Sequence, residues 1–302
     1  MNVTHTVTET RAAVAQLARP VGLVPTMGAF HDGHLALIGA ARERCASVVV
    51  SLFVNPTQFG EDNDYRSYPR DESHDLALAD ETGVDLLFAP TPAEMYRNGA
   101  ATLVHVDGPL TSSFEGAERP GHFDGVATVV TKLFTIATPD GAFFGRKDAQ
   151  QLALVRRLTA DLDFAVEIVA VETVREADGL AMSSRNAHLS EKDRAKAPDL
   201  YRSLRAGRAV VTDGVRAVVD QVTGKLVVGF GPRLQEVPVE GDTGPLFSVD
   251  YVAVVDPETF EKVADITPRS LIIAAVRLHE TRLIDNLPIG EPPYDNEKEA
   301  AT

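Results

Sequence analysis

Residues 21–54 read VGLVPTMGAFHDGHLALIGAARERCASVVVSLFV. The short apolar run at 21–24 ends at Pro25, and from 34 to 44 the apolar residues recur at helical spacing. Residues 47–54 are β-branched and apolar without alternation, which is typical of a parallel strand buried on both faces. This stretch therefore predicts a strand, a loop, a helix and a second strand, in that order.

The same alternation continues along the chain. Helices are predicted at 73–81, 124–137 and 152–162, and strands at 84–89, 140–144 and 165–171. Strands that alternate with helices form βαβ units, whose right-handed crossovers give a parallel sheet. We therefore expect an α/β domain, a doubly wound parallel sheet, over residues 1–175.

The pattern changes after residue 175. Further elements are predicted as helices at 190–211 and 215–222, an irregular Gly- and Pro-rich stretch at 224–244, and strands at 249–255 and 271–275. These elements favour a smaller α+β domain over residues 176–289. The polar tail at 290–302 is expected to be disordered.

Composition and charge exclude several classes of protein. The 302 residues are 44% apolar and 24% charged, as in an ordinary globular protein of two domains. A net charge of -15 repels phosphate backbones and anionic lipids, which excludes nucleic acid and membrane surfaces as partners. The polar N-terminus, the lack of a long apolar run and the single cysteine, Cys45, predict a cytoplasmic protein.

A histidine pair marks the loop after the first strand. His31 and His34 lie at the start of the predicted helix, where both can project from one side of the turn. A helix N-terminus at the carboxyl end of a strand binds phosphate through its N–H groups, and Gly28 and Gly33 allow close backbone approach. Two surface histidines that merely cap the helix would give the same pattern. The spacing does not match a zinc site.

A second cluster, FFGRKDAQQ at 143–151, also joins a strand to a helix. Lys147 can neutralise phosphate, and Asp148 can accept ribose hydroxyls or cap the helix. Gln150 and Gln151 face different directions on a helix, so only one of them need line a pocket. An exposed capping turn remains the alternative.

A third cluster, VREADGLAMSSRN at 174–186, lies at the predicted domain junction. Ser183, Ser184 and Arg185 supply hydroxyl and guanidinium donors for a polyphosphate. Because this cluster follows the two others along the chain, its position favours a second phosphate loop.

Two further segments precede or follow predicted elements. In NPTQF at 55–59, the Asn and Gln amides can bind the carboxylate and hydroxyls of a small acid. In RPGHFDGV at 119–126, Arg119 and His122 fit either an active site or a structural loop.

Together these segments resemble the pantothenate synthetase (pantoate–β-alanine ligase) family. The matching segments, in order, are PTMGAFHDGH (25–34), NPTQF (55–59), RPGHFDGV (119–126), FFGRKDAQQL (143–152), VREADGLAMSSRN (174–186) and TRLIDN (281–286). The His-x-Gly-His spacing is similar to that of the adenylyl-transferring superfamily that includes class I aminoacyl-tRNA synthetases. The resemblance implies a Rossmann-like, HIGH-type nucleotidyltransferase fold with a C-terminal lid domain.

The resemblance also implies a reaction and a set of roles. Pantoate and Mg-ATP would give pantoyl adenylate and pyrophosphate, and β-alanine would then give pantothenate and AMP. Mg2+ would be held mainly by the ATP phosphates, without direct protein ligands, and the protein would be a homodimer. The implied roles are catalytic for His31, His34, Lys147 and Arg185, ATP-binding for Met27, Gly145, Asp148, Val174, Met182, Ser183 and Ser184, and pantoate-binding for Thr26, Gln58 and Gln151.

The chain departs from the family pattern at a few positions. Arg146 stands where a Glu is usual, Ala149 where an aromatic residue is usual, and His279-Glu280 where a small Gly-type turn is usual. Residues 221–248 also fit the helical pattern of the family poorly. Two alternatives stay open: a paralogue that adenylates another small acid, and a catalytically weak nucleotide-binding regulatory protein.

Overall fold

The computed structural model describes residues 1–59, 65–66, 68–97, 101–230 and 247–290. The chain divides into two compact units. The first comprises Met1–Arg146 and Gln150–Glu172, and the second comprises Lys147–Ala149 and the chain from Thr173.

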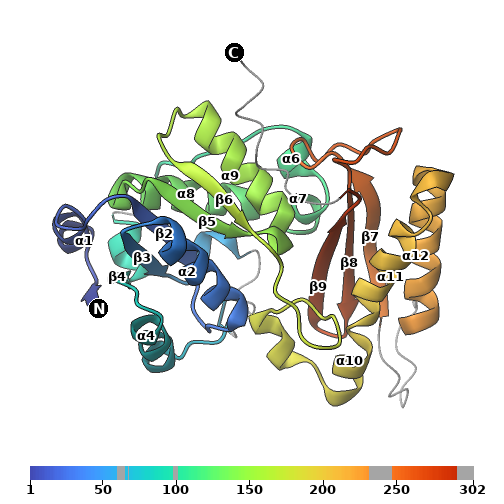
Figure 1. The fold of residues 1–302 in the computed structure, drawn as a ribbon, viewed down its shortest axis with the longest axis horizontal. Helices are drawn as coiled ribbons and strands as arrows, with labels where there is room; N and C mark the ends of the chain where they lie inside the picture. The colour runs from blue at the N-terminus through green and yellow to red at the C-terminus, as the bar shows by residue number, and fades with distance from the viewer. Residues whose placement is uncertain (60–64, 67, 98–100, 231–246, 291–302) are drawn as a thin grey trace. The chain divides into compact units, whose positions relative to one another are not determined.

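The first unit is built on a six-stranded parallel sheet (Figure 1). Its strands are β1 (Asn2–Thr4), β2 (Val21–Thr26), β3 (Ser47–Leu52), β4 (Leu86–Phe88), β5 (Gly141–Gly145) and β6 (Glu167–Val171). They lie in the order β1-β4-β3-β2-β5-β6, and every pair is parallel. The predicted doubly wound sheet is therefore confirmed.

Helices cover both faces of this sheet. α1 (Val7–Val14), α5 (Pro92–Met95), α8 (His122–Ala137) and α9 (Ala149–Asp161) pack in one core, and α2 (Asp32–Arg44) and α4 (Glu72–Glu81) in the other. The chain here also forms the short helices α6 (Pro109–Ser112) and α7 (Glu115–Glu118) and the 3-10 turns η1 (Pro56–Gln58) and η2 (Arg146–Asp148), of which Lys147 and Asp148 belong to the second unit. Side chains alternate along each strand, so neighbouring residues enter different cores. Leu23 packs with α8 and α9, whereas Val24 packs with α2 and α4.

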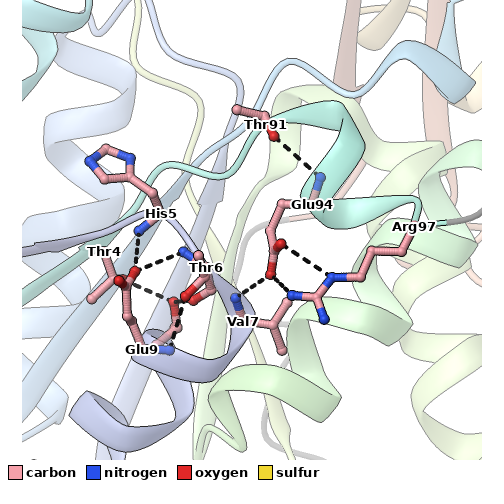
Figure 2. Close-up of polar contacts among 9 residues, drawn as sticks. Thr4, His5, Thr6, Val7, Glu9, Thr91, Glu94 and Arg97 are labelled. Carbon is pink, nitrogen blue, oxygen red and sulfur yellow. Dashed lines mark hydrogen bonds and ion pairs between the residues drawn. The ribbon is translucent and has the colours of Figure 1, made fainter.

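The N-terminal segment holds β1 and α1, which the sequence patterns did not predict. β1 pairs with β4, and Thr6 and Glu9 form a reciprocal capping box at the start of α1 (Figure 2). The Glu94 carboxylate accepts a 2.8 Å hydrogen bond from the Val7 N–H and pairs with Arg97, as Figure 2 shows. These polar bonds fix a segment that has little apolar periodicity.

Pro25 does not end the first predicted strand, which is a correction. β2 continues to Thr26, whose carbonyl accepts a hydrogen bond from Phe53 on the β3 side. On the other side, β5 pairs with β2 only at Gly22 and Leu23. Pro25 faces that side beyond the last pair, so its missing N–H breaks no ladder bond.

The second unit pairs a small antiparallel sheet with helices, as predicted for an α+β domain. Its elements are η3 (Ser184–His188), α10 (Glu191–Lys196), α11 (Asp199–Arg208), η4 (Val211–Asp213), α12 (Val215–Phe230), β7 (Phe247–Val255), β8 (Leu271–Leu278) and β9 (Thr281–Pro288). The strand order is β7-β8-β9, and α11 and α12 pack on the sheet (Figure 1).

Three expectations for this unit need correction. The helix expected at 190–211 is broken into α10 and α11, because proline at position 198 has no N–H to continue α10. The irregular stretch expected from 224 is helical to Phe230, since Val218, Val222, Leu226 and Phe230 recur on one buried face. β9, at 281–288, was not predicted as a strand. Residues 231–246 and the tail from 291 lie outside the described residues.

Candidate functional site

The strand order of the first unit creates a switch point between β2 and β5. From β2 the chain moves outward through β3 and β4, and it later returns to place β5 on the other side of β2. The helices that follow these two strands, α2 and α9, pack in different cores on opposite faces of the sheet. In open α/β sheets, ligands bind at the carboxyl ends of the strands at such a point. The first two sequence clusters follow Thr26 of β2 and Gly145 of β5, so both begin at this edge.

A buried carboxylate shapes the loop after β2. Asp75 of α4 is 1% exposed and accepts hydrogen bonds from the N–H groups of Ala29 (2.9 Å) and Phe30 (2.7 Å). These bonds stabilise a backbone that has positive φ at Gly28 (87°) and Ala29 (52°). Burial raises the pKa of the Asp75 carboxyl, and the two N–H donors oppose that shift.

Sequence reasoning missed Asp75. Its only signal is that it lies four residues before Ala79 on the buried face of α4, where an unpaired carboxylate would be costly. A buried Asp on an otherwise apolar helix face indicates a polar partner that the spacing cannot identify.

The two histidines cap α2 reciprocally. The His31 Nδ1 accepts from the Gly33 N–H at 3.1 Å, and the His34 Nδ1 accepts from the His31 N–H at 3.3 Å. Their rings lie 4.1 Å apart between centroids. A neutral ring that accepts at Nδ1 carries its proton at Nε2, so each histidine holds an N–H donor at that atom. The capping interpretation and the phosphate interpretation are therefore compatible in one arrangement.

The amide segment after β3 is folded onto itself. Gln58 is 7% exposed, and its Oε1 accepts from the Asn55 amide at 3.1 Å. The Gln58 Nε2 lies 2.9 Å from the Met27 Sδ, so these two predicted ligand residues are brought together. The Thr26 hydroxyl donates to the Ser51 carbonyl at 2.6 Å, which fixes the end of β2 against β3.

Arg119 and His122 bind the main chain of this segment. The Gln58 carbonyl lies 2.7 Å from the His122 Nδ1 and accepts from Arg119 at 3.2 Å. A Cβ on Gly125 would lie 2.4 Å from the Thr57 carbonyl oxygen, which shows how closely α8 approaches η1. Of the two open interpretations, these contacts support the structural loop.

The cluster after β5 separates its two glutamines. Gln150 is 4% exposed and bonds to the main chain of Leu110, Ser113 and Glu115. Gln151 is only partly buried. The fold thus uses Gln150 as a structural bridge and leaves Gln151 as the member of the pair that can contact a ligand.

Arg146 has an acidic partner at the end of the neighbouring strand. Its Nε lies 2.9 Å from a carboxylate oxygen of Glu172. The Arg146 side chain is 14% exposed, whereas that of Glu172 is 66% exposed. The Glu172 carboxylate, just after β6, thus compensates the positive charge of Arg146, the residue that departs from the family pattern.

In the second unit, residues 174–186 form a tight hairpin. Arg175 and Ala181 form an isolated antiparallel bridge, and the Met182 N–H donates to the Val174 carbonyl at 3.0 Å. The Asn186 amide donates to the Ala181 carbonyl at 3.1 Å, next to Ser183, Ser184 and Arg185. Of the predicted ATP residues in this cluster, Val174 and Met182 close the hairpin, and Ser183 and Ser184 follow it.

Lys147 and Asp148 belong to the second unit. The Lys147 carbonyl accepts a 2.9 Å hydrogen bond from the Asn286 amide of β9. Asn286 lies in the TRLIDN segment (281–286), and no spacing in the sequence predicts this bond.

Among the described residues, no group of three or more His, Cys, Asp or Glu side chains could hold a metal ion. No helix in the described ranges is long and apolar enough to cross a membrane.

Comparison with known proteins gives consistent matches over nearly the whole chain. Residues 2–288 match the family model described as pantoate-beta-alanine ligase. A pantothenate synthetase of Thermus thermophilus is 52% identical over 289 residues, which cover 96% of this chain and 99% of that protein. The pantothenate synthetase of Heliobacterium modesticaldum is 49% identical over 274 residues, which cover 90% and 92%.

Solved structures agree with these matches. A crystal structure of the pantothenate synthetase from Thermus thermophilus has a TM-score of 0.87 at 49% identity and covers 96% of this chain and 100% of its own. The pantoate-beta-alanine ligase of Francisella tularensis, in complex with beta-gamma ATP and beta-alanine, has a TM-score of 0.77 at 29% identity. It covers 97% of this chain and 99% of its own.

Proposed function

The chain belongs to the pantoate–beta-alanine ligase family, and it condenses pantoate with β-alanine to form pantothenate at the expense of ATP. We propose that it does so in two steps, through the residues described above. In the first step, a pantoate carboxylate oxygen attacks the α-phosphorus of ATP, and pyrophosphate leaves. In the second step, the β-alanine amine attacks the acyl carbon of the adenylate, a C–N bond forms, and AMP leaves with loss of the amine proton.

His31, His34, Lys147 and Arg185 stabilise the charge that grows on pyrophosphate. The observation that carries this assignment is the reciprocal capping of α2, which gives each histidine an Nε2–H donor beside a helix N-terminus. Donors placed where charge develops lower the barrier of the chemical step. Lys147 and Arg185 add full positive charge, and no protein nucleophile is required.

The remaining residues bind and orient the two substrates. Thr26, Gln58 and Gln151 hold pantoate, and the Gln58–Met27 contact supports a shared wall between pantoate and nucleotide. Met27, Gly145, Asp148, Val174, Met182, Ser183 and Ser184 bind ATP. A Cβ on Gly145 would meet no atom within 4 Å, so this position has room for a ligand near its backbone.

Mg2+ is part of the proposal as an ion carried by ATP. The residues at the proposed phosphate site are cationic or neutral donors, which fit phosphate oxygens rather than a cation. Bound to ATP, the ion supplies further charge neutralisation at the phosphates.

We also propose a C-terminal unit that acts as a lid, a homodimer, and a cytoplasmic location. A lid would protect the adenylate from water. The resemblance supports the dimer, and the demand for ATP and a small acid supports the cytoplasm. Sedimentation of the purified protein tests the dimer directly.

The experiment that tests the function measures pyrophosphate and AMP released from Mg-ATP, with pantoate and β-alanine added singly and together. We expect pantoate-dependent pyrophosphate, and pantothenate with sustained AMP release only when both substrates are present. ATP binding without pantoate-dependent pyrophosphate would contradict the proposal, and other small acids serve as specificity controls.

A further inference from the structure

The carboxyl-terminal half of β9 carries two adjacent polar residues, Asp285 and Asn286, that face opposite sides of the strand. Asp285 shares its side with Leu283 and Leu287, which lie in the core of the second unit. Asn286 faces the other side, and both residues are buried, at 4% and 6% exposed. Buried polar side chains within a strand need specific partners.

Asp285 binds Arg175 at the base of the 174–186 hairpin. Its two carboxylate oxygens accept from the Arg175 guanidinium at 2.6 and 3.0 Å. The guanidinium also lies 3.6 Å from the centroid of the Tyr201 ring and donates to the Gly179 carbonyl. Burial raises the pKa of Asp285, and the bonds from Arg175 oppose that shift. A bidentate pair stacked on an aromatic ring fixes both position and orientation.

The hairpin connects the Arg175–Asp285 pair to the proposed phosphate residues Ser183 and Arg185. Arg175 pairs with Ala181, and Ser183 begins two residues later. Arg194 adds a second anchor, because its guanidinium bonds to both Glu176 and Asp178. The first arm of the hairpin is therefore held at Arg175, Glu176 and Asp178, and the bridge to Ala181 ties the second arm to it.

Asn286 holds the main chain of Lys147. Its amide donates to the Lys147 carbonyl at 2.9 Å, and its own N–H donates to the Asp285 carboxylate at 2.8 Å. The Lys147 charge also acts favourably on the Asp285 carboxylate. Two consecutive residues of β9 thus bind Lys147 on one side and Arg175, at the base of the hairpin, on the other.

We propose that Asp285 and Asn286 are positioning residues for adenylation, which fix Lys147 relative to Ser183 and Arg185 so that both cationic groups meet the same phosphates. This inference rests on the proposed function, because it assigns those residues to ATP. A shift of about 1 Å in a charge-stabilising group can cost on the order of 100-fold in rate.

A purely structural role would also explain these bonds, and a double-mutant cycle separates the two. Lys147→Ala removes the ammonium but keeps the main-chain carbonyl, so the bond from Asn286 survives in that variant. A contribution to folding would then be unchanged, whereas a contribution that acts through the ammonium would disappear.

The experiment measures kcat and KM for pantoate-dependent pyrophosphate release in the native chain, Lys147→Ala, Asn286→Ala and the double variant. We expect Asn286→Ala to lower kcat by about 10- to 100-fold in the native chain. The expected loss is less than about 2-fold when Lys147 is already Ala. Ser203→Ala, which also loses a buried bond to a main-chain carbonyl, is the matched control and should leave kcat unchanged.

Several results would overturn the inference. One is a loss of kcat from Asn286→Ala that is equal in the native chain and in Lys147→Ala. Another is a kcat for Asn286→Ala that equals the kcat of Ser203→Ala. Asn286→Leu keeps the side-chain volume if Asn286→Ala fails to fold, and failure of both to fold would assign Asn286 to folding instead. A native chain without pantoate-dependent pyrophosphate release would refute the proposed function itself.

Discussion

At the scale of single residues, one ring atom decides how the histidine pair can act. In both His31 and His34, Nδ1 accepts a hydrogen bond from a backbone N–H, so the cap and the proposed phosphate contact use different atoms of the same ring. Substitutions that replace one atom at a time therefore separate folding from catalysis.

His34→Asn keeps an acceptor near the Nδ1 position but has no group at the Nε2 position. We expect its adenylation rate to fall by about 100-fold, as for loss of a charge-stabilising donor, with little change in Tm. Thermal unfolding and pantoate-dependent pyrophosphate release measure the two effects. His34→Gln, which places an amide nitrogen farther out, is the control and should retain more activity. A fully active His34→Asn would refute the role of Nε2.

Arg146 has an acidic partner that compensates its charge within the first unit. The ion pair with Glu172 joins the end of β5 to the end of β6, and only the Arg146 side is well buried. A charge that departs from the family pattern is thus compatible with the fold.

Arg146→Glu would place two carboxylates in contact. We expect a loss of about 1 kcal/mol in the free energy of unfolding, from a lost pair and a like-charge contact. Glu172→Lys in the same chain should restore most of it. Denaturant unfolding and adenylation assays of both variants check this. If the double variant regains stability but not adenylation, Arg146 instead acts on ATP.

At the scale of elements, α11 and α12 cross at a point where no side chain fits. A Cβ on Gly207 would lie 2.3 Å from the Val222 Cγ2, so the glycine is required by the close approach of the two helices. A Cβ on Gly224, in α12, would have no atom within 4 Å. The same substitution therefore has opposite consequences at the two positions.

Gly207→Ala should destabilise the protein by about 1–3 kcal/mol through overpacking. Val222→Ala added to it should relieve the clash, so that the double variant is more stable than the sum of the single effects. Gly224→Ala should stabilise α12 by about 0.5–1 kcal/mol. Urea unfolding followed by circular dichroism measures all three. Additive losses for Gly207 and Val222 would show that they do not clash.

Elements with strong periodicity were predicted well, and those held by single polar bonds were not. α8 follows its apolar spacing from His122 to Ala137, and β3 follows its apolar run. β1 is only three residues long, and its support comes from β4 and polar bonds. Gly and Pro content favoured irregular structure from 224, but burial at every fourth residue extends α12 to Phe230.

At the scale of the whole molecule, the proposed ATP residues belong to two units. His31 and His34 are in the first, and Lys147, Ser183 and Arg185 are in the second. One ATP that uses all of them should stabilise both units together.

Hydrogen exchange tests this proposal. With a non-hydrolysable ATP analogue and pantoate, we expect slower amide exchange in both 26–34 and 174–186. At 100 times Kd, the stabilisation is about 2.7 kcal/mol. Protection confined to one unit would show that the other does not contribute to ATP binding.

The alternating α/β pattern, the α+β character of the second unit and the polar clusters at strand ends are all encoded locally in the sequence, because periodicity and strand-end position are local properties. The contacts that support the site depend instead on how the chain folds. Asp75 reaches Phe30 across 45 positions, and Asn286 reaches Lys147 across 139. Such partners are set by how strands and helices pack, and no spacing along the chain encodes them.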